Sequence, residues 1–140
     1  MLFRSGYCLA RTVDTRGLAI ALFFGLTFTA GHLTQELRDH RVDARNGIRT
    51  NAVHFGPRRA LLASLTLFTL AQAALVALAL GGVLPRGIAA VGLLVPLQVH
   101  WFGQVLADGL TPASICRLQV RYRILHGVIG CTMVAALWLA

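Results

Sequence analysis

The stretch ALLASLTLFTLAQAALVALALGGVL, residues 60–84, decides the fold of this chain. It contains no charged residue, and only Gln72 and a few hydroxyl groups interrupt its apolar side chains. About 20 such residues in a helix cross the roughly 30 Å hydrocarbon layer of a bilayer. Pro57 before the run and Pro85 after it favour a helix start and a helix stop. The stretch therefore predicts a membrane-spanning helix.

Three further apolar runs accompany the first, at residues 17–37, 87–107 and 124–140. Hydrophobic residues make up 56% of the chain and charged residues only 13%, which leaves too little polar surface for a soluble domain. We therefore expect one all-α, integral membrane domain over residues 1–140, a bundle of about four transmembrane helices with a charged loop at residues 38–59.

The charge pattern predicts the orientation of this bundle. All thirteen basic residues are arginines, and they lie at the ends of the apolar runs rather than on one face, which argues against nucleic acid as a partner. Nine of them fall within residues 37–59 and 108–123, and four fall in the N-terminal segment and at Arg86. The positive-inside rule then places the charged loop in the cytoplasm, with the cell inner membrane as the expected location. The arginine-rich N-terminal segment would lie outside, an arrangement that would make sense if further chain preceded it.

Seven of the eighteen charged residues, including three of the five acidic ones, lie in the strip HLTQELRDHRVDARNGIRTNAVHFG, residues 32–56. Asp39 and Asp43 stand one helical turn apart, so their carboxylates point the same way. Two like charges at this spacing disfavour a helix unless a cation lies between them, and Mg²⁺ commonly takes one or two carboxylates and leaves its other positions to water and phosphates. The pattern makes Asp39 and Asp43 candidate metal ligands. The alternative from the residues alone is a solvated polar face.

A helix through this strip would have two faces. We expect an acidic inner face that supports the metal ligands and continues into small residues able to pack closely, and an opposite, basic face turned toward lipid headgroups. The inner face comprises His32, Glu36, Asp39 and Asp43 and runs through Gly25 and Ala21; the basic face comprises Arg38, Arg41 and Arg45 and runs through Ile20 and Phe23. Asn46 and Gly47 would end the helix, and Arg49 beyond them could bind a diphosphate.

The segment QELRDHRVDARNGIRTNAVHFGPRRA resembles the second aspartate-rich motif of the UbiA superfamily of intramembrane prenyltransferases. Asp39 and Asp43 take its two aspartate places. The Gly-Ile-Arg-Thr and Ala-Val-x-x-Gly positions that follow are matched by Gly47, Thr50, Val53 and Gly56. The later segment YRILHGVIG is similar to the closing helix of the family.

The resemblance implies a bundle of about nine helices in which aspartate motifs on two cytoplasmic loops hold magnesium on the diphosphate of an isoprenoid donor. An aromatic or other lipophilic acceptor then takes the prenyl group. Asp39 and Asp43 would be metal ligands. The family's other motif, NDxxDxxxD, has no counterpart here, since the remaining aspartates, Asp14 and Asp108, each stand alone. The resemblance therefore covers the C-terminal, roughly four-helix portion.

Two functions follow as expectations. The first is the C-terminal part of a UbiA-like prenyltransferase that uses Mg²⁺, transfers a prenyl group rather than a methyl group, and works with a missing N-terminal half. The second is a non-catalytic membrane protein, a degenerate homologue that acts as a partner or structural subunit. Magnesium and diphosphate binding would favour the first.

Overall fold

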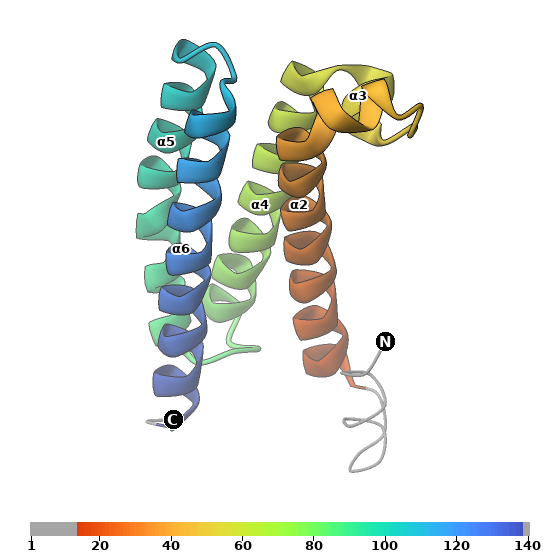
Figure 1. Cartoon of the computed structure of the whole chain (residues 1–140). Coiled ribbons are helices and arrows are strands. Elements are labelled where there is room, and N and C mark those ends of the chain that lie inside the picture. The colour runs from red at the N-terminus through yellow and green to blue at the C-terminus, as the bar shows by residue number, and fades with distance from the viewer. Residues whose placement is uncertain (1–13, 139–140) are drawn as a thin grey trace.

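The computed structural model describes residues 14–138, and every regular element in that range is a helix (Figure 1). The all-α expectation is confirmed. In chain order the elements are α2 (Thr15–Arg45), α3 (Asn51–Phe55), α4 (Pro57–Leu80), the 3₁₀ helix η1 (Arg86–Leu94), α5 (Val95–Ala107) and α6 (Pro112–Trp138).

Local sequence signals set the helix ends. Asp14 caps α2, because its Oδ1 accepts a 2.7 Å hydrogen bond from the Gly17 N–H. Asn46 caps the other end, and Gly47 follows it with φ +70°, a conformation that glycine adopts without strain. Pro57 occupies the first turn of α4, where its missing N–H costs no helical hydrogen bond. The predicted helix end at Asn46 and Gly47 is thus confirmed.

Three helical segments in the described range are long and apolar enough to cross a membrane: Gly17–Arg45, Pro57–Leu80 and Arg86–Ala107. They make the chain an integral membrane protein. The third segment is not one α-helix, since it begins as η1 and becomes α-helical at Val95. The fourth expected span, residues 124–140, falls within α6, which begins earlier, at Pro112, and is described as far as Trp138; residues 139 and 140 lie outside the described part of the chain.

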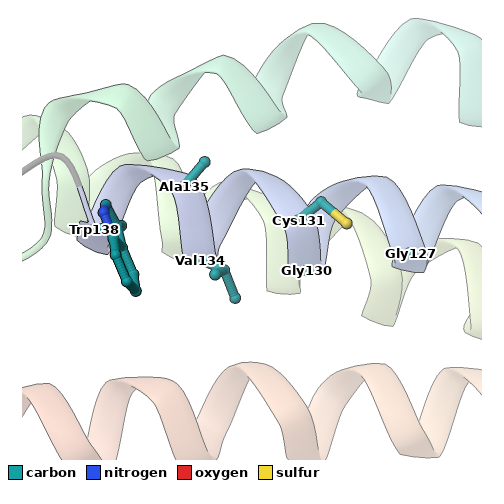
Figure 2. A pocket seen from close by; sticks show the side chains of 6 residues that line it. All are labelled: Gly127, Gly130, Cys131, Val134, Ala135 and Trp138. Carbon is teal, nitrogen blue, oxygen red and sulfur yellow. The ribbon is translucent and has the colours of Figure 1, made fainter.

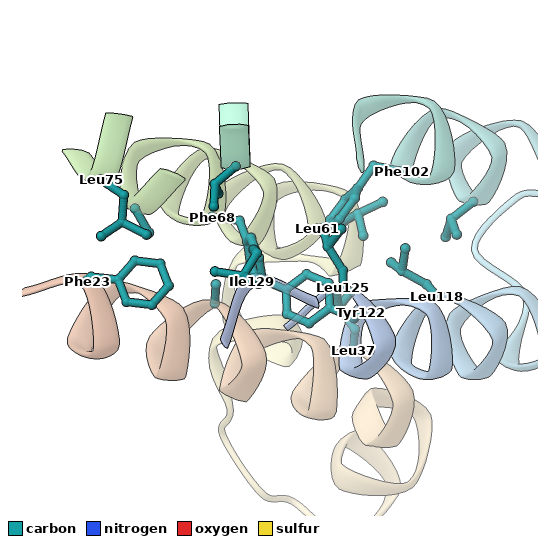
Figure 3. Close-up of a cluster of buried hydrophobic side chains, with 14 of the residues drawn as sticks. Phe23, Leu37, Leu61, Phe68, Leu75, Phe102, Leu118, Tyr122, Leu125 and Ile129 are labelled. Carbon is teal, nitrogen blue, oxygen red and sulfur yellow. The ribbon is translucent and has the colours of Figure 1, made fainter. Parts of the chain in front are cut away.

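Helix α4 lies between the other elements. It runs beside α2 over much of its length and contacts η1 and α5 on its other side, while α6 packs on η1 and α5 (Figure 1). Small residues let α2 and α4 approach closely: Ala30 is fully buried, and Ser64 Oγ donates a 2.9 Å hydrogen bond to the Ala30 carbonyl. Aromatic rings join α4 and α6 in the core, where the Phe68 and Tyr122 centroids lie 3.8 Å apart (Figure 3).

The expected orientation of α2 about its axis is wrong for the membrane portion. Ala21 and Gly25, predicted to pack closely, are exposed, whereas Phe23, predicted to face lipid, is only 3% exposed. The buried stripe passes through Phe23, Ala30 and Leu37, which are seven residues apart and so share one face. This stripe of buried residues packs toward α4. The face of α2 that carries the acidic residues therefore does not determine how the two helices contact each other.

Candidate functional site

The candidate site lies where α2 continues beyond its apolar portion. Asp39 and Arg38 are bonded to each other there: Arg38 Nε and Nη2 donate to the two Asp39 oxygens at 2.8 and 2.7 Å. The pair is exposed, and such pairs contribute at most about 1 kcal/mol. Arg38 therefore does not stand apart on a basic face, as the sequence suggested. Its guanidinium is bonded to both oxygens of a carboxylate that the sequence predicts as a metal ligand.

Asp43 stands one turn further along α2 and is partly exposed. Its backbone carbonyl accepts a 2.8 Å hydrogen bond from the Ile48 N–H, which belongs to the chain reversal after Gly47. The Asp43 side chain lies at the polar end of α2. Because Asp43 and Glu36 are seven residues apart, their side chains leave the helix on the same side. The helix brings Asp39 and Asp43 to adjacent turns, as predicted.

Glu36 is the most enclosed charged residue of the strip, with 8% of its surface exposed. Its Oε1 lies 3.2 Å from His32 Nε2 and accepts a 3.1 Å hydrogen bond from Asn51 Nδ2. Its Oε2 accepts a 3.2 Å hydrogen bond from the Ala52 N–H. Both carboxylate oxygens are therefore engaged in holding α3 against α2, and neither points to Asp39 or Asp43 in these contacts.

Arg49 is exposed in the short segment between α2 and α3. Thr50, the next residue, caps α3, because its Oγ1 accepts from the Val53 N–H at 3.4 Å. Within residues 14–138 no group of three or more His, Cys, Asp or Glu side chains stands close enough to hold a metal ion. The structure therefore brings together His32 with Glu36, and separately Asp39 with Arg38.

The donor chemistry at Asp39 and Asp43 nevertheless fits magnesium. Mg²⁺ prefers oxygen ligands and keeps several waters, so one or two carboxylates next to solvent supply a sufficient share of its protein ligands. Both side chains are partly exposed, which leaves room for water and phosphate oxygens. The Arg38 contact would have to open, at a small cost for an exposed pair.

A groove of about 660 Å³ runs between α2 and α6 toward this charged end. Its apolar part is lined by aromatic and aliphatic side chains, among them Phe24, Phe28 and Met133, and its polar part by His32 and Arg123. Gln119 Nε2 bridges the two helices by donating to the Thr34 carbonyl at 3.0 Å. The groove can take an elongated apolar molecule with a polar end.

A second hollow, of about 700 Å³, follows α6 alone and is lined by Gly127, Gly130, Cys131, Val134, Ala135 and Trp138 (Figure 2). Its lining is apolar and carries no charged group. We assign no chemistry to it.

Sequence reasoning missed the contact between Glu36 and the start of α3. The signal was available in part, since Thr50 with Asn51 is typical of a helix N-terminus, which attracts a carboxylate. It also missed the Gln119 bridge, because a glutamine among the arginines of residues 117–123 gives no sign of a partner on another helix. A second glutamine, Gln98, joins α5 to α4, since its Nε2 donates to Thr69 Oγ1 at 3.3 Å.

Comparison with known proteins identifies a family. The family model described as the UbiA prenyltransferase family matches residues 3–117, which include the charged strip, most of the helices and the first turns of α6. The YRILHGVIG segment lies beyond the matched range, so its similarity stays a prediction. No curated protein and no solved structure is similar enough to match. Because the match covers well over half of the sequence, the chain belongs to the UbiA prenyltransferase family.

Proposed function

We propose that this chain takes part in magnesium-dependent transfer of a prenyl group from an isoprenoid diphosphate to an aromatic or other lipophilic acceptor. The observation that carries the proposal is the Asp39–Asp43 turn, at the polar end of a spanning helix in a UbiA-family chain. Such a position lets carboxylates meet a water-soluble headgroup while the apolar tail stays in the bilayer.

The proposal assigns a role to each of the candidate site residues. Asp39 and Asp43 hold magnesium, and Arg49 binds diphosphate oxygens through its planar, bidentate guanidinium. Magnesium, when bound, neutralises charge that develops on the departing diphosphate. The apolar part of the groove between α2 and α6 holds the lipophilic portion of a substrate away from water.

A second aspartate motif is part of the proposal. The only carboxylates outside the strip are Asp14 and Asp108, each alone in sequence. We propose that an N-terminal half bearing NDxxDxxxD completes the site and that the chain alone has little activity. In the cell, the aspartate end would face the cytoplasm from the inner membrane, because nine of the thirteen arginines fall within residues 37–59 and 108–123, which the positive-inside rule assigns to that side.

The test is reconstitution. The chain is purified alone and together with a UbiA-type N-terminal half, and transfer from a radiolabelled prenyl diphosphate is measured with and without Mg²⁺. We expect magnesium-dependent product from the pair, lowered about 100-fold or more by Asp39→Asn or Asp43→Asn, since each change removes a charged ligand. Asp108→Asn, a matched change in a surface ion pair, should leave the rate unchanged. An inactive pair would refute catalysis, and full activity in both strip variants would refute the metal role.

The alternative function is a non-catalytic membrane subunit. The absence of a three-ligand cluster within residues 14–138 favours it, together with the missing first motif. Under this alternative the chain would co-purify stoichiometrically with another membrane protein, and Mg²⁺ and inorganic pyrophosphate would not bind in titration calorimetry.

A further inference from the structure

The contact between Glu36 and α3 buries a side chain that can carry a charge. A carboxylate that is 8% exposed is costly to bury unless its oxygens are satisfied. Here they are satisfied from three directions: His32 one turn earlier on α2, the Asn51 side chain, and the Ala52 backbone N–H. The last is an N–H in the first turn of α3 that has no partner inside its own helix. Glu36 therefore adds three polar contacts to a junction where Ala52 of α3 and Leu37 of α2 are fully buried.

The position of this contact along α2 determines the path of the segment before α3. At 1.5 Å per residue, Asp43 lies roughly 10 Å further along α2 than Glu36, and Asp39 roughly 4.5 Å further. Ile48 is bonded to the Asp43 carbonyl, and three residues later Asn51 is bonded to Glu36. The chain thus turns back along α2 between these two points, past the turn that carries Asp39.

Arg49 lies between the two attachments. Ile48 precedes it directly, and Asn51 follows after one residue. Glu36 and Asp43 differ by only about 20° around the helix, because they are seven residues apart. The segment that carries Arg49 is therefore fixed to α2 on both sides, at the Asp43 carbonyl before Arg49 and at the Glu36 carboxylate after it, and loss of the Glu36 attachment would free one side.

We propose that Glu36 is a positioning residue: its buried carboxylate fastens the start of α3 to α2 and thereby holds Arg49 beside the Asp39–Asp43 turn. The inference rests on the proposed function in one respect, namely that Arg49 binds a diphosphate. The attachment itself does not depend on that function. Glu36 thus acts through Arg49 and binds neither metal nor substrate.

The first experiment measures the attachment. The full chain in lipid nanodiscs is digested briefly with trypsin, and cleavage after Arg49 is quantified by mass spectrometry relative to cleavage after exposed Arg86 at the opposite end. We expect Glu36→Ala to raise this ratio about tenfold, because local opening exposes the segment to the protease. Glu36→Gln keeps an acceptor for the Ala52 N–H and should give a smaller rise. The matched control, Asp108→Asn, should give none. An unchanged ratio in Glu36→Ala would overturn the proposal.

The second experiment measures what the attachment does. Binding of magnesium pyrophosphate is titrated for the wild-type chain, Glu36→Ala, Arg49→Ala and the double variant. We expect each single change to weaken binding about tenfold and the double variant to lose no more than Arg49→Ala alone, because the two residues form one unit. Additive losses would overturn the role through Arg49. Absence of wild-type binding would refute the diphosphate role of Arg49 in this chain. The trypsin ratio would still decide the attachment, and reconstitution with an N-terminal half would still decide the proposed function.

Discussion

At the scale of single residues, the buried polar side chains of this chain differ in whether they have hydrogen-bond partners. At the charged end, Glu36 accepts a hydrogen bond from Asn51. Deeper in the bundle, Gln72 is fully buried, and neither atom of its amide is hydrogen-bonded to the described residues. Gln98, also fully buried, donates to Thr69. A buried amide without hydrogen-bond partners lowers stability, because it has given up its hydrogen bonds to water. An amide that makes a hydrogen bond between two helices offsets this cost.

Gln72→Leu should therefore stabilise the chain. The change removes an unsatisfied amide and keeps a similar volume, so we expect the free energy of unfolding to rise by about 1–2 kcal/mol. Unfolding in mixed detergent micelles with increasing sodium dodecyl sulfate, followed by circular dichroism, measures it. The control is Gln98→Leu, which loses the bond to Thr69 and should bring no gain. If Gln72→Leu lowered the free energy of unfolding, the prediction would be wrong, and the Gln72 amide would have a hydrogen-bond partner outside the described contacts.

At the scale of elements, the interface between α2 and α4 organises the bundle. It depends on side chains small enough to bring the two backbones together, as the hydrogen bond from Ser64 to the Ala30 carbonyl requires. The same helix exposes Ala21. Two alanines nine residues apart on α2 therefore differ in environment although the sequence around each is equally apolar.

The pair Ala30→Leu and Ala21→Leu tests this orientation of α2. We expect Ala30→Leu to lower the free energy of unfolding by about 1–3 kcal/mol, because a close-packed interface has no room for three more carbons. Ala21→Leu should change it by less than about 0.5 kcal/mol, because its side chain is exposed. The same denaturation measurement serves for both. Equal effects, or a larger effect at Ala21, would contradict the packed stripe through Phe23, Ala30 and Leu37.

At the scale of the whole molecule, the helices place two charged loops at one end. The segment between α2 and α4 and the turn between α5 and α6 lie at the same end of the bundle (Figure 1). Exposed Cys116, near the start of α6, belongs to that end, since the nearby Gln119 contacts Thr34 of α2. This cysteine can report which side of the membrane the aspartate end faces.

A membrane-impermeant maleimide tests the proposed orientation. In a variant that retains only Cys116, with Cys8→Ala and Cys131→Ala, we expect labelling in inverted inner-membrane vesicles and none in intact spheroplasts. A variant that retains only Cys8 serves as the control, because the N-terminal segment is predicted to lie outside. Labelling of Cys116 from the outer face would reverse the predicted topology and move the aspartate turn away from the cytoplasm.

The amino-acid sequence by itself determined the helical membrane class, the helix end at Asn46 and Gly47, and the turn that carries Asp39 and Asp43. These features depend on apolar length, capping and helical spacing, which are local properties of the chain. Only the tertiary structure decided that Phe23 rather than Gly25 is buried and that Glu36 holds Ala52 across sixteen residues. Those outcomes depend on where α4 and α3 come to lie, because burial and hydrogen bonding between elements arise only once the elements pack.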